Sequence, residues 1–176
     1  MCSAARFNTW RLQVCPHDSF FNSCRCILLE KQSQLITGAS QGNSALLHVG
    51  FDAKPGTVEQ QCVREGFSLM MHLHKQLHVP VKRVGALIIA WEQEQLSKLA
   101  DIVRLAAENG VHNCVQLTRE QLLQREPNLS PLAQGAVYVP DEAVVDGWLT
   151  PMSYAAQAVA NGAVIRRDFE VTGGMP

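Results

Sequence analysis

The chain has 176 residues, of which 47% are hydrophobic and 18% charged, and its formal net charge is −1 at pH 7. This length allows one domain with a hydrophobic core but not two ordinary domains, and the composition excludes a disordered chain. A charge this close to zero gives no electrostatic reason to expect nucleic acid or an anionic membrane as a partner.

The longest apolar run, from Val84 to Trp91, has the length of a strand and is too short to span a bilayer. Six cysteines are present: Cys2, Cys15, Cys24, Cys26, Cys62 and Cys114. Their even number would suit disulfides, but the chain lacks the short, loop-rich character of a disulfide scaffold. We therefore expect reduced thiols in an intracellular protein, cytoplasmic or alternatively mitochondrial.

Residues 1–25 contain no glycine, whereas a nucleotide-binding domain usually starts with an apolar strand, G-x-G-x-x-G and a helix. The first βα unit is therefore expected to be missing or replaced. One interpretation is a targeting peptide, since Arg6 and Arg11 precede any acidic residue. Another is a metal site formed by Cys15, His17, Cys24 and Cys26, although the spacing of these residues is not a standard one for zinc. A substituted N-terminus, poorly packed against the rest, is the interpretation that we favour.

From Cys26 onward the pattern becomes regular. Ile27, Leu28 and Leu29 form an apolar strand that ends on Glu30, the arrangement of a second Rossmann strand whose acid binds a ribose. The loop from Gln32 to Ser44 is rich in small residues, which let backbone N–H groups approach a phosphate or ribityl chain. A short apolar segment, Ala45 to Phe51, carries His48 and leads to a turn at Pro55-Gly56.

A helix is predicted from Thr57 to His78, with Thr57 and Gln60 as a capping box. One stripe at helical spacing is expected to face the core: Val58, Cys62, Gly66, Leu69, Leu73 and Leu77. The histidines near its end do not form a complete set of metal ligands, because residues two apart point to different faces of a helix.

The next elements follow in alternation. Val81 to Trp91 is predicted as one buried strand, and Glu92 to Asn109 as a helix that Gly110 ends. The inner face of this helix is expected to carry Leu96, Leu99, Val103 and Ala106. Then come a strand at Val111–Leu117, a short helix capped by Thr118 and Gln121, and a strand at Gly135–Pro140. An acidic loop (Asp141, Glu142, Asp146), a helix capped by Thr150 and a final strand at Ala163–Val171 complete the chain. This alternation predicts an α/β fold.

The segments LLEK and GASQGNSALLHVGFDAKPGT resemble the second FAD-contacting segment of FAD-dependent oxidoreductases of the D-amino-acid oxidase superfamily. The branch that they resemble contains glycerol-3-phosphate dehydrogenase-like and L-2-hydroxyglutarate dehydrogenase-like enzymes. The resemblance runs from about Cys26 to the C-terminus. It implies a partial FAD-binding, Rossmann-like domain over residues 26–176, with part of a substrate-side α+β domain inserted at residues 81–139.

The resemblance also implies roles for individual residues. Glu30 would bind the adenosine ribose, and the backbone of Val171 would meet the adenine. The pyrophosphate and ribityl chain would lie along Lys31, Ser40, Gly42, Asn43 and Ser44. His48 would lie beside the isoalloxazine ring and act on a small-molecule substrate, because imidazole titrates near neutral pH and can take up a proton. The alternative is that His48 is a packed core residue.

The function implied is FAD-dependent oxidation of a CH–OH donor such as glycerol 3-phosphate or a 2-hydroxy acid. Two departures from the family pattern lead us to expect weak or absent FAD binding and an inactive fragment. The glycine fingerprint that holds the pyrophosphate is absent, and Gly173-Gly174-Met175-Pro176 resembles an interruption. The alternative function is a truncated product without catalysis, or a fragment that binds a partner.

Overall fold

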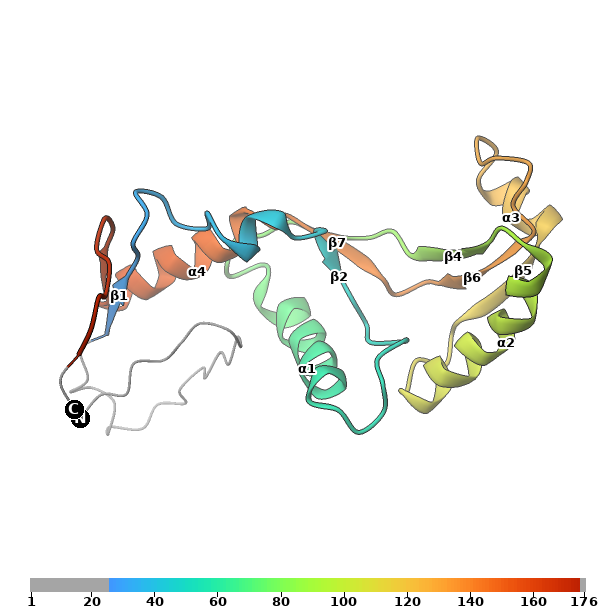
Figure 1. The fold of residues 1–176 in the computed structure, drawn as a ribbon, viewed down its shortest axis with the longest axis horizontal. Helices are drawn as coiled ribbons and strands as arrows, with labels where there is room; N and C mark the ends of the chain where they lie inside the picture. The colour runs from blue at the N-terminus through green and yellow to red at the C-terminus, as the bar shows by residue number, and fades with distance from the viewer. Residues whose placement is uncertain (1–25, 175–176) are drawn as a thin grey trace.

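The computed structural model describes residues 26–174, so the expectations for residues 1–25 lie outside the described part. Three small sheets follow one another along an elongated molecule (Figure 1). At one end, β1 (Ile27–Leu29) pairs in parallel with β8 (Val164–Arg166), next to α4 (Leu149–Ala160). This mixture of helices and strands confirms the predicted α/β class.

The middle sheet is antiparallel, with β7 (Ala143–Val145) between β2 (Leu46–Leu47) and β3 (Val81–Arg83). A 3₁₀ turn, η1 (Ala39–Gly42), precedes β2, and α1 (Val58–Leu73) follows it. The third sheet is also antiparallel, with β6 (Gly135–Val139) between β4 (Ala86–Ala90) and β5 (Val115–Thr118). It is accompanied by α2 (Gln93–Glu108) and α3 (Arg119–Arg125) (Figure 1).

The main core lies where α2 meets β4 and β6. Its buried side chains are Val49, Phe51, Ala90, Leu99, Ala106, Val137 and Val139. The predicted inner face of α2 is confirmed, because Leu99 and Ala106 are buried and Leu96 and Val103 pack against them. Asn109 at the end of α2 is also buried, and its amide donates to the carbonyls of Phe51 (3.1 Å) and Ala53 (2.8 Å). Hydrogen bonds thus tie α2 to the segment that follows β2.

The pairing of β1 with β8 brings together the two ends of the described chain. Ile27 lies opposite Val164, and Leu29 opposite Arg166. The last strand was predicted to reach Val171, but β8 ends at Arg166. Beyond it, the N–H groups of Asp168 and Phe169 donate to the carbonyls of Gln32 and Glu30. The expected association of these strands is confirmed, whereas the division into residues 26–176 with an insertion at 81–139 stays a prediction.

The single strand predicted for Val81–Trp91 is wrong. It is two strands, β3 and β4, which belong to different sheets. Gly85 has φ +72°, a left-handed conformation that favours glycine. The N–H groups of Val84 (3.3 Å) and Gly85 (2.9 Å) both donate to the carbonyl of Glu142. This turn lets the apolar run leave the middle sheet and enter the third one.

The first helix is shorter than predicted. It begins as expected, since the Thr57 side chain accepts from the N–H of Gln60, but it ends at Leu73 rather than His78. His78 has φ +54°, and Pro80 disfavours a helical conformation at the residue before it. The predicted core stripe is wrong for most of the helix: Val58 is 72% exposed and Leu69 40% exposed, and Met70 is the buried residue of the helix. Only Leu77, which lies after the end of α1, is buried as predicted.

The last third of the chain departs from prediction at three places. The fifth strand starts at Val115 rather than Val111, because residues 112–113 form a turn. The acidic loop contains β7, and Glu142 is 1% exposed rather than in solvent. The helix α4 begins at Leu149, so Thr150 lies inside it and is not its cap. Oδ1 of Asp146, just before the helix, accepts from the N–H groups of Trp148 (3.0 Å) and Leu149 (2.8 Å). No helix within residues 26–174 is both long and apolar enough to cross a membrane.

Candidate functional site

A cavity of about 550 Å³ lies between the small-residue loop, α1 and the start of α4. The loop and β2 contribute Ala39, Ser40, Asn43, Leu46, Leu47 and His48. The α1 helix contributes Cys62, Val63, Gly66, Phe67, Leu69 and Met70. The third wall consists of Val145, Gly147, Thr150, Pro151 and Tyr154. A mostly apolar cavity with a few polar groups is typical of a small-molecule or cofactor site.

This cavity explains the wrong prediction for α1. The apolar stripe that was expected to face a core instead lines the cavity through Cys62, Gly66 and Leu69. Periodicity identifies an apolar face but does not distinguish a core from a binding surface. The stripe was therefore correctly located on the helix and wrongly assigned to the interior.

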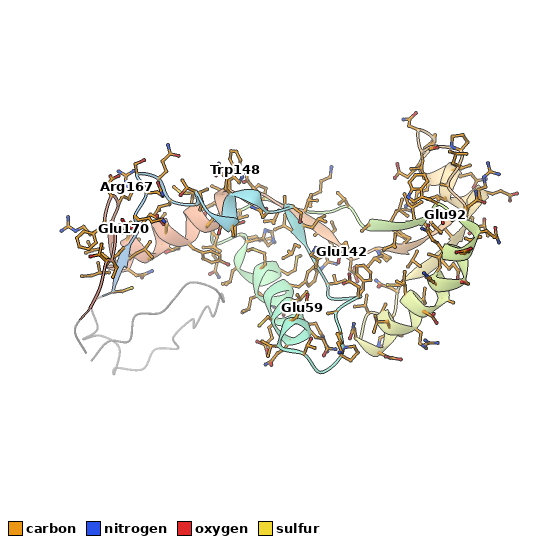
Figure 2. All side chains as sticks on the ribbon, viewed as in Figure 1. Glu59, Glu92, Glu142, Trp148, Arg167 and Glu170 are labelled. Atoms are coloured by element: carbon orange, nitrogen blue, oxygen red, sulfur yellow. The ribbon has the colours of Figure 1, made fainter. Side chains whose placement is uncertain are left out.

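His48 follows β2 and lines the cavity, and its side chain is 46% exposed. It is therefore not the packed core residue of the alternative interpretation. Its Nδ1 lies 2.9 Å from Oε2 of Glu142, a side chain that is 1% exposed. Figure 2 shows Glu142 near the middle of the molecule, close to β2. The other carboxylate oxygen, Oε1, accepts a hydrogen bond of 2.8 Å from the N–H of Val49.

Asn43 connects the small-residue loop to the start of α4. Its Nδ2 donates to the carbonyls of Ser40 (2.6 Å) and Gly147 (3.2 Å), and its Oδ1 accepts from the N–H of Ala45 (2.8 Å). A Cβ built on Gly147 would overlap the Asn43 amide, so glycine is required for this close approach. Asn43 thus shapes the cavity wall, and its contact with a cofactor stays a prediction.

The other predicted residues divide into two groups. Ser40 lines the cavity with Asn43 and His48, whereas Gly42 and Ser44 lie in the same loop without lining it.

Glu30 and Val171 lie at the β1–β8 end, where the N–H of Phe169 donates to the carbonyl of Glu30 (3.0 Å). The carboxylate of Glu30 accepts from the N–H of Gln32 (2.8 Å). Lys31 and Val171 are exposed.

Two residues of the site were missed from the sequence. Glu142 resembles an ordinary loop acid, and no local signal distinguishes it from Asp141. Tyr154 lines the cavity from α4, four residues after Thr150, so a helical face shared with Thr150 was the available signal. Burial raises the pKa of the Tyr154 phenol above its ordinary value, so the phenol stays protonated at alkaline pH as well as at neutral pH.

Cys114 lies near the same carboxylates but is less suited to chemistry. Burial, and after it the charges of Asp141 and Glu142, raise the pKa of the Cys114 thiol. A raised pKa lowers the fraction of thiolate at neutral pH, and the thiolate is the nucleophilic form. His48 is therefore the stronger candidate for a reactive group at this site.

Comparison with known proteins agrees with these observations. A family model described as "FAD dependent oxidoreductase" matches residues 22–175. The chain is 33% identical over 144 residues to a glycerol 3-phosphate dehydrogenase of Caloramator mitchellensis, covering 82% of this chain and 30% of that protein. It is 28% identical over 146 residues to the mitochondrial L-2-hydroxyglutarate dehydrogenase of Mus musculus, covering 83% and 31% respectively. The chain thus spans about a third of the length of the curated relatives it matches.

Solved structures share the fold. An L-alpha-glycerophosphate oxidase from Mycoplasma pneumoniae with FAD bound superposes with a TM-score of 0.76 at 22% identity, covering 84% of this chain and 39% of the other. A glycine oxidase from Bacillus cereus gives a TM-score of 0.77 at 24% identity, with 88% and 42% coverage. At these identities the likeness establishes the fold of the described part.

Proposed function

This chain belongs to the FAD-dependent oxidoreductase family, whose cofactor is FAD, and we propose that it forms one wall of the flavin and substrate site of a dehydrogenase. The donor that we propose is a CH–OH compound such as glycerol 3-phosphate or a 2-hydroxy acid. Support for these donors comes from the names of the relatives, glycerol 3-phosphate dehydrogenase and L-2-hydroxyglutarate dehydrogenase.

The observation that carries this proposal is the position of His48. It lines an apolar cavity, and its Nδ1 lies beside a buried carboxylate. Bound FAD supplies the two-electron acceptor for oxidation of an alcohol. Such an oxidation also requires removal of the hydroxyl proton, and an imidazole at the cavity wall is suited to accept it.

The residues present fit parts of FAD. Apolar walls interrupted by Ser40, Thr150 and Tyr154 suit a flat aromatic ring system with a few hydrogen-bonding groups at its edge. The loop is suited to a phosphate or ribityl chain, because no atom lies within 4 Å of a Cβ built on Gly38 or Gly42. At the end of β1, Glu30 is half-buried and would accept hydrogen bonds from the ribose.

A titration with FAD tests this proposal, with flavin fluorescence as the signal. We expect weak binding, with a Kd above about 1 µM, because the chain carries no G-x-G-x-x-G run to hold the pyrophosphate. Gly66→Phe should weaken binding at least about tenfold, since the new ring would fill the cavity. The Cβ position of Gly66 is open, so the helix itself should tolerate the change.

Ser68→Phe is the matched control, because Ser68 is an exposed residue of the same helix that does not line this cavity. It should bind FAD as the unmodified protein does. Equal binding by Gly66→Phe and Ser68→Phe would show that the cavity is not the flavin site. No quenching at millimolar FAD would show that the described part of the chain does not hold flavin by itself and would favour the second candidate function.

The second candidate is a role in partner binding without catalysis. It is favoured by exposed apolar side chains at the β1–β8 end: Ile27, Leu29, Val159, Phe169 and Val171. Such a patch is typical of an interaction surface. Absence of FAD binding combined with concentration-dependent association in light scattering would favour this candidate.

A further inference from the structure

The geometry points to Glu142 as a positioning residue for His48. Its buried carboxylate holds the ring proton on Nδ1 of the imidazole and so leaves Nε2 as the atom that accepts a proton. The catalytic meaning of this arrangement rests on the proposed function of His48. The position of the ring proton does not, and it is measurable without FAD.

Glu142 is held through both its side chain and its backbone. Oε1 of the carboxylate accepts from the N–H of Val49 at 2.8 Å, and the backbone carbonyl of Glu142 accepts from the N–H groups of Val84 and Gly85. These hydrogen bonds fix the carboxylate in the turn that joins β6 to β7, at the start of β7. Oε2 is left facing Nδ1 of His48 at 2.9 Å.

Within residues 26–174, Oε2 is a buried side-chain oxygen without a hydrogen bond, because Nδ1 of His48 is within reach but not in line with it. A buried carboxylate oxygen without a partner is costly, so a donor in reach is strongly favoured. The His48 side chain is 46% exposed, so burial does not fix its ring, and a small rotation would bring the Nδ1–H into line with Oε2.

Neighbouring charged groups do not compete for this contact. The carboxylate of Asp141 is engaged elsewhere, by Arg83 (3.4 Å) and by the amide of Asn113 (2.7 Å). Cys114, whose thiol is kept protonated by burial and by the charges of Asp141 and Glu142, is a weak donor. The imidazole N–H of His48 is therefore the natural partner of Oε2.

The test is ¹⁵N NMR of the histidine rings in the whole chain at about pH 9, where a free imidazole is neutral. The His48 signals are identified by their loss in His48→Gln. We expect the form with the proton on Nδ1 to predominate in the unmodified protein. In Glu142→Gln the amide oxygen must still accept from Val49, so the amide N–H₂ faces Nδ1 and donates to it. The proton should then move to Nε2, a change in the ratio of the two forms of about tenfold or more.

Asp141→Asn is the matched control, because it removes a neighbouring negative charge without touching His48. It should leave the ratio of the two protonated forms of His48 unchanged. The His72 signals should be the same in the unmodified protein and in all variants. An unchanged ratio in Glu142→Gln would overturn the proposal, as would a proton on Nε2 in the unmodified protein. If Glu142→Gln misfolds, Glu142→Asp supplies the second test. Its shorter side chain retracts the carboxylate, and the share of the Nδ1 form should fall. Failure of the FAD titration would leave these outcomes unaffected.

Discussion

Glu142 connects three separate segments of the chain. Its side chain accepts from Val49 after β2, and its carbonyl accepts from the turn between β3 and β4. It also faces His48 at the cavity wall. A buried carboxylate is costly unless each oxygen has a partner, so this position combines structural and chemical demands. Two neutral substitutions separate these demands.

We expect Glu142→Leu to be less stable than Glu142→Gln by about 1–3 kcal/mol. Both variants remove the charge, but glutamine keeps an acceptor for the N–H of Val49, whereas leucine leaves that buried group unpaired. Urea unfolding of the two proteins measures the difference. Equal stabilities would mean that water satisfies the Val49 N–H and that the site is more open than the structure shows.

At the scale of the elements, Gly85 decides where one strand ends and the next begins. It has φ +72°, and a Cβ built there would lie 2.5 Å from Cε2 of Tyr138. The Tyr138 ring is itself held by the Arg125 guanidinium, 3.7 Å from the ring centre. A side chain at this position would meet both backbone strain and a ring with little freedom to move.

Gly85→Ala and Gly56→Ala form a matched pair. Gly56 has a similar φ of +76° but open space at its Cβ. Gly56→Ala should therefore lower the stability only by the backbone strain of the left-handed conformation, about 1–2 kcal/mol. Gly85→Ala should lose about 1–3 kcal/mol more, because Tyr138 must be displaced. Thermal unfolding by circular dichroism compares them. Similar melting temperatures would show that Tyr138 moves freely and does not fix the turn.

At the scale of the whole molecule, burial is unevenly distributed among the three sheets. Four of the five residues of β6 are buried, and α2 packs against this strand. At the other end, β1, α4 and β8 contain no buried residue, and the sheet has two strands (Figure 1). Two-stranded sheets with little buried apolar surface are only marginally stable.

Hydrogen exchange should therefore differ along the molecule. Amides of β1 and β8 are expected to exchange faster than those of β6 by about a hundredfold or more, because local opening costs less free energy where few side chains are buried. Mass spectrometry of peptides from the two ends measures this ratio. Equal protection would indicate that the β1–β8 end unfolds together with the main core.

Local signals in the sequence predicted much of the fold. The capping pair Thr118 and Gln121 and the glycine after Asn109 depend on residues within one turn, and all are found as expected. The strand before Glu30, the loop with Ser40 and the apolar segment with His48 were likewise located, because apolar runs and small residues can be read directly from the sequence.

Only the tertiary structure decided which surfaces face each other. The apolar stripe of α1 lines a cavity, one apolar run divides between two sheets at Gly85, and Glu142 is buried beside His48. Val49 and Glu142 are 93 residues apart, and no local pattern records that their segments meet. Periodicity specifies which face of an element is apolar. What covers that face depends on the packing of segments that are distant in the chain.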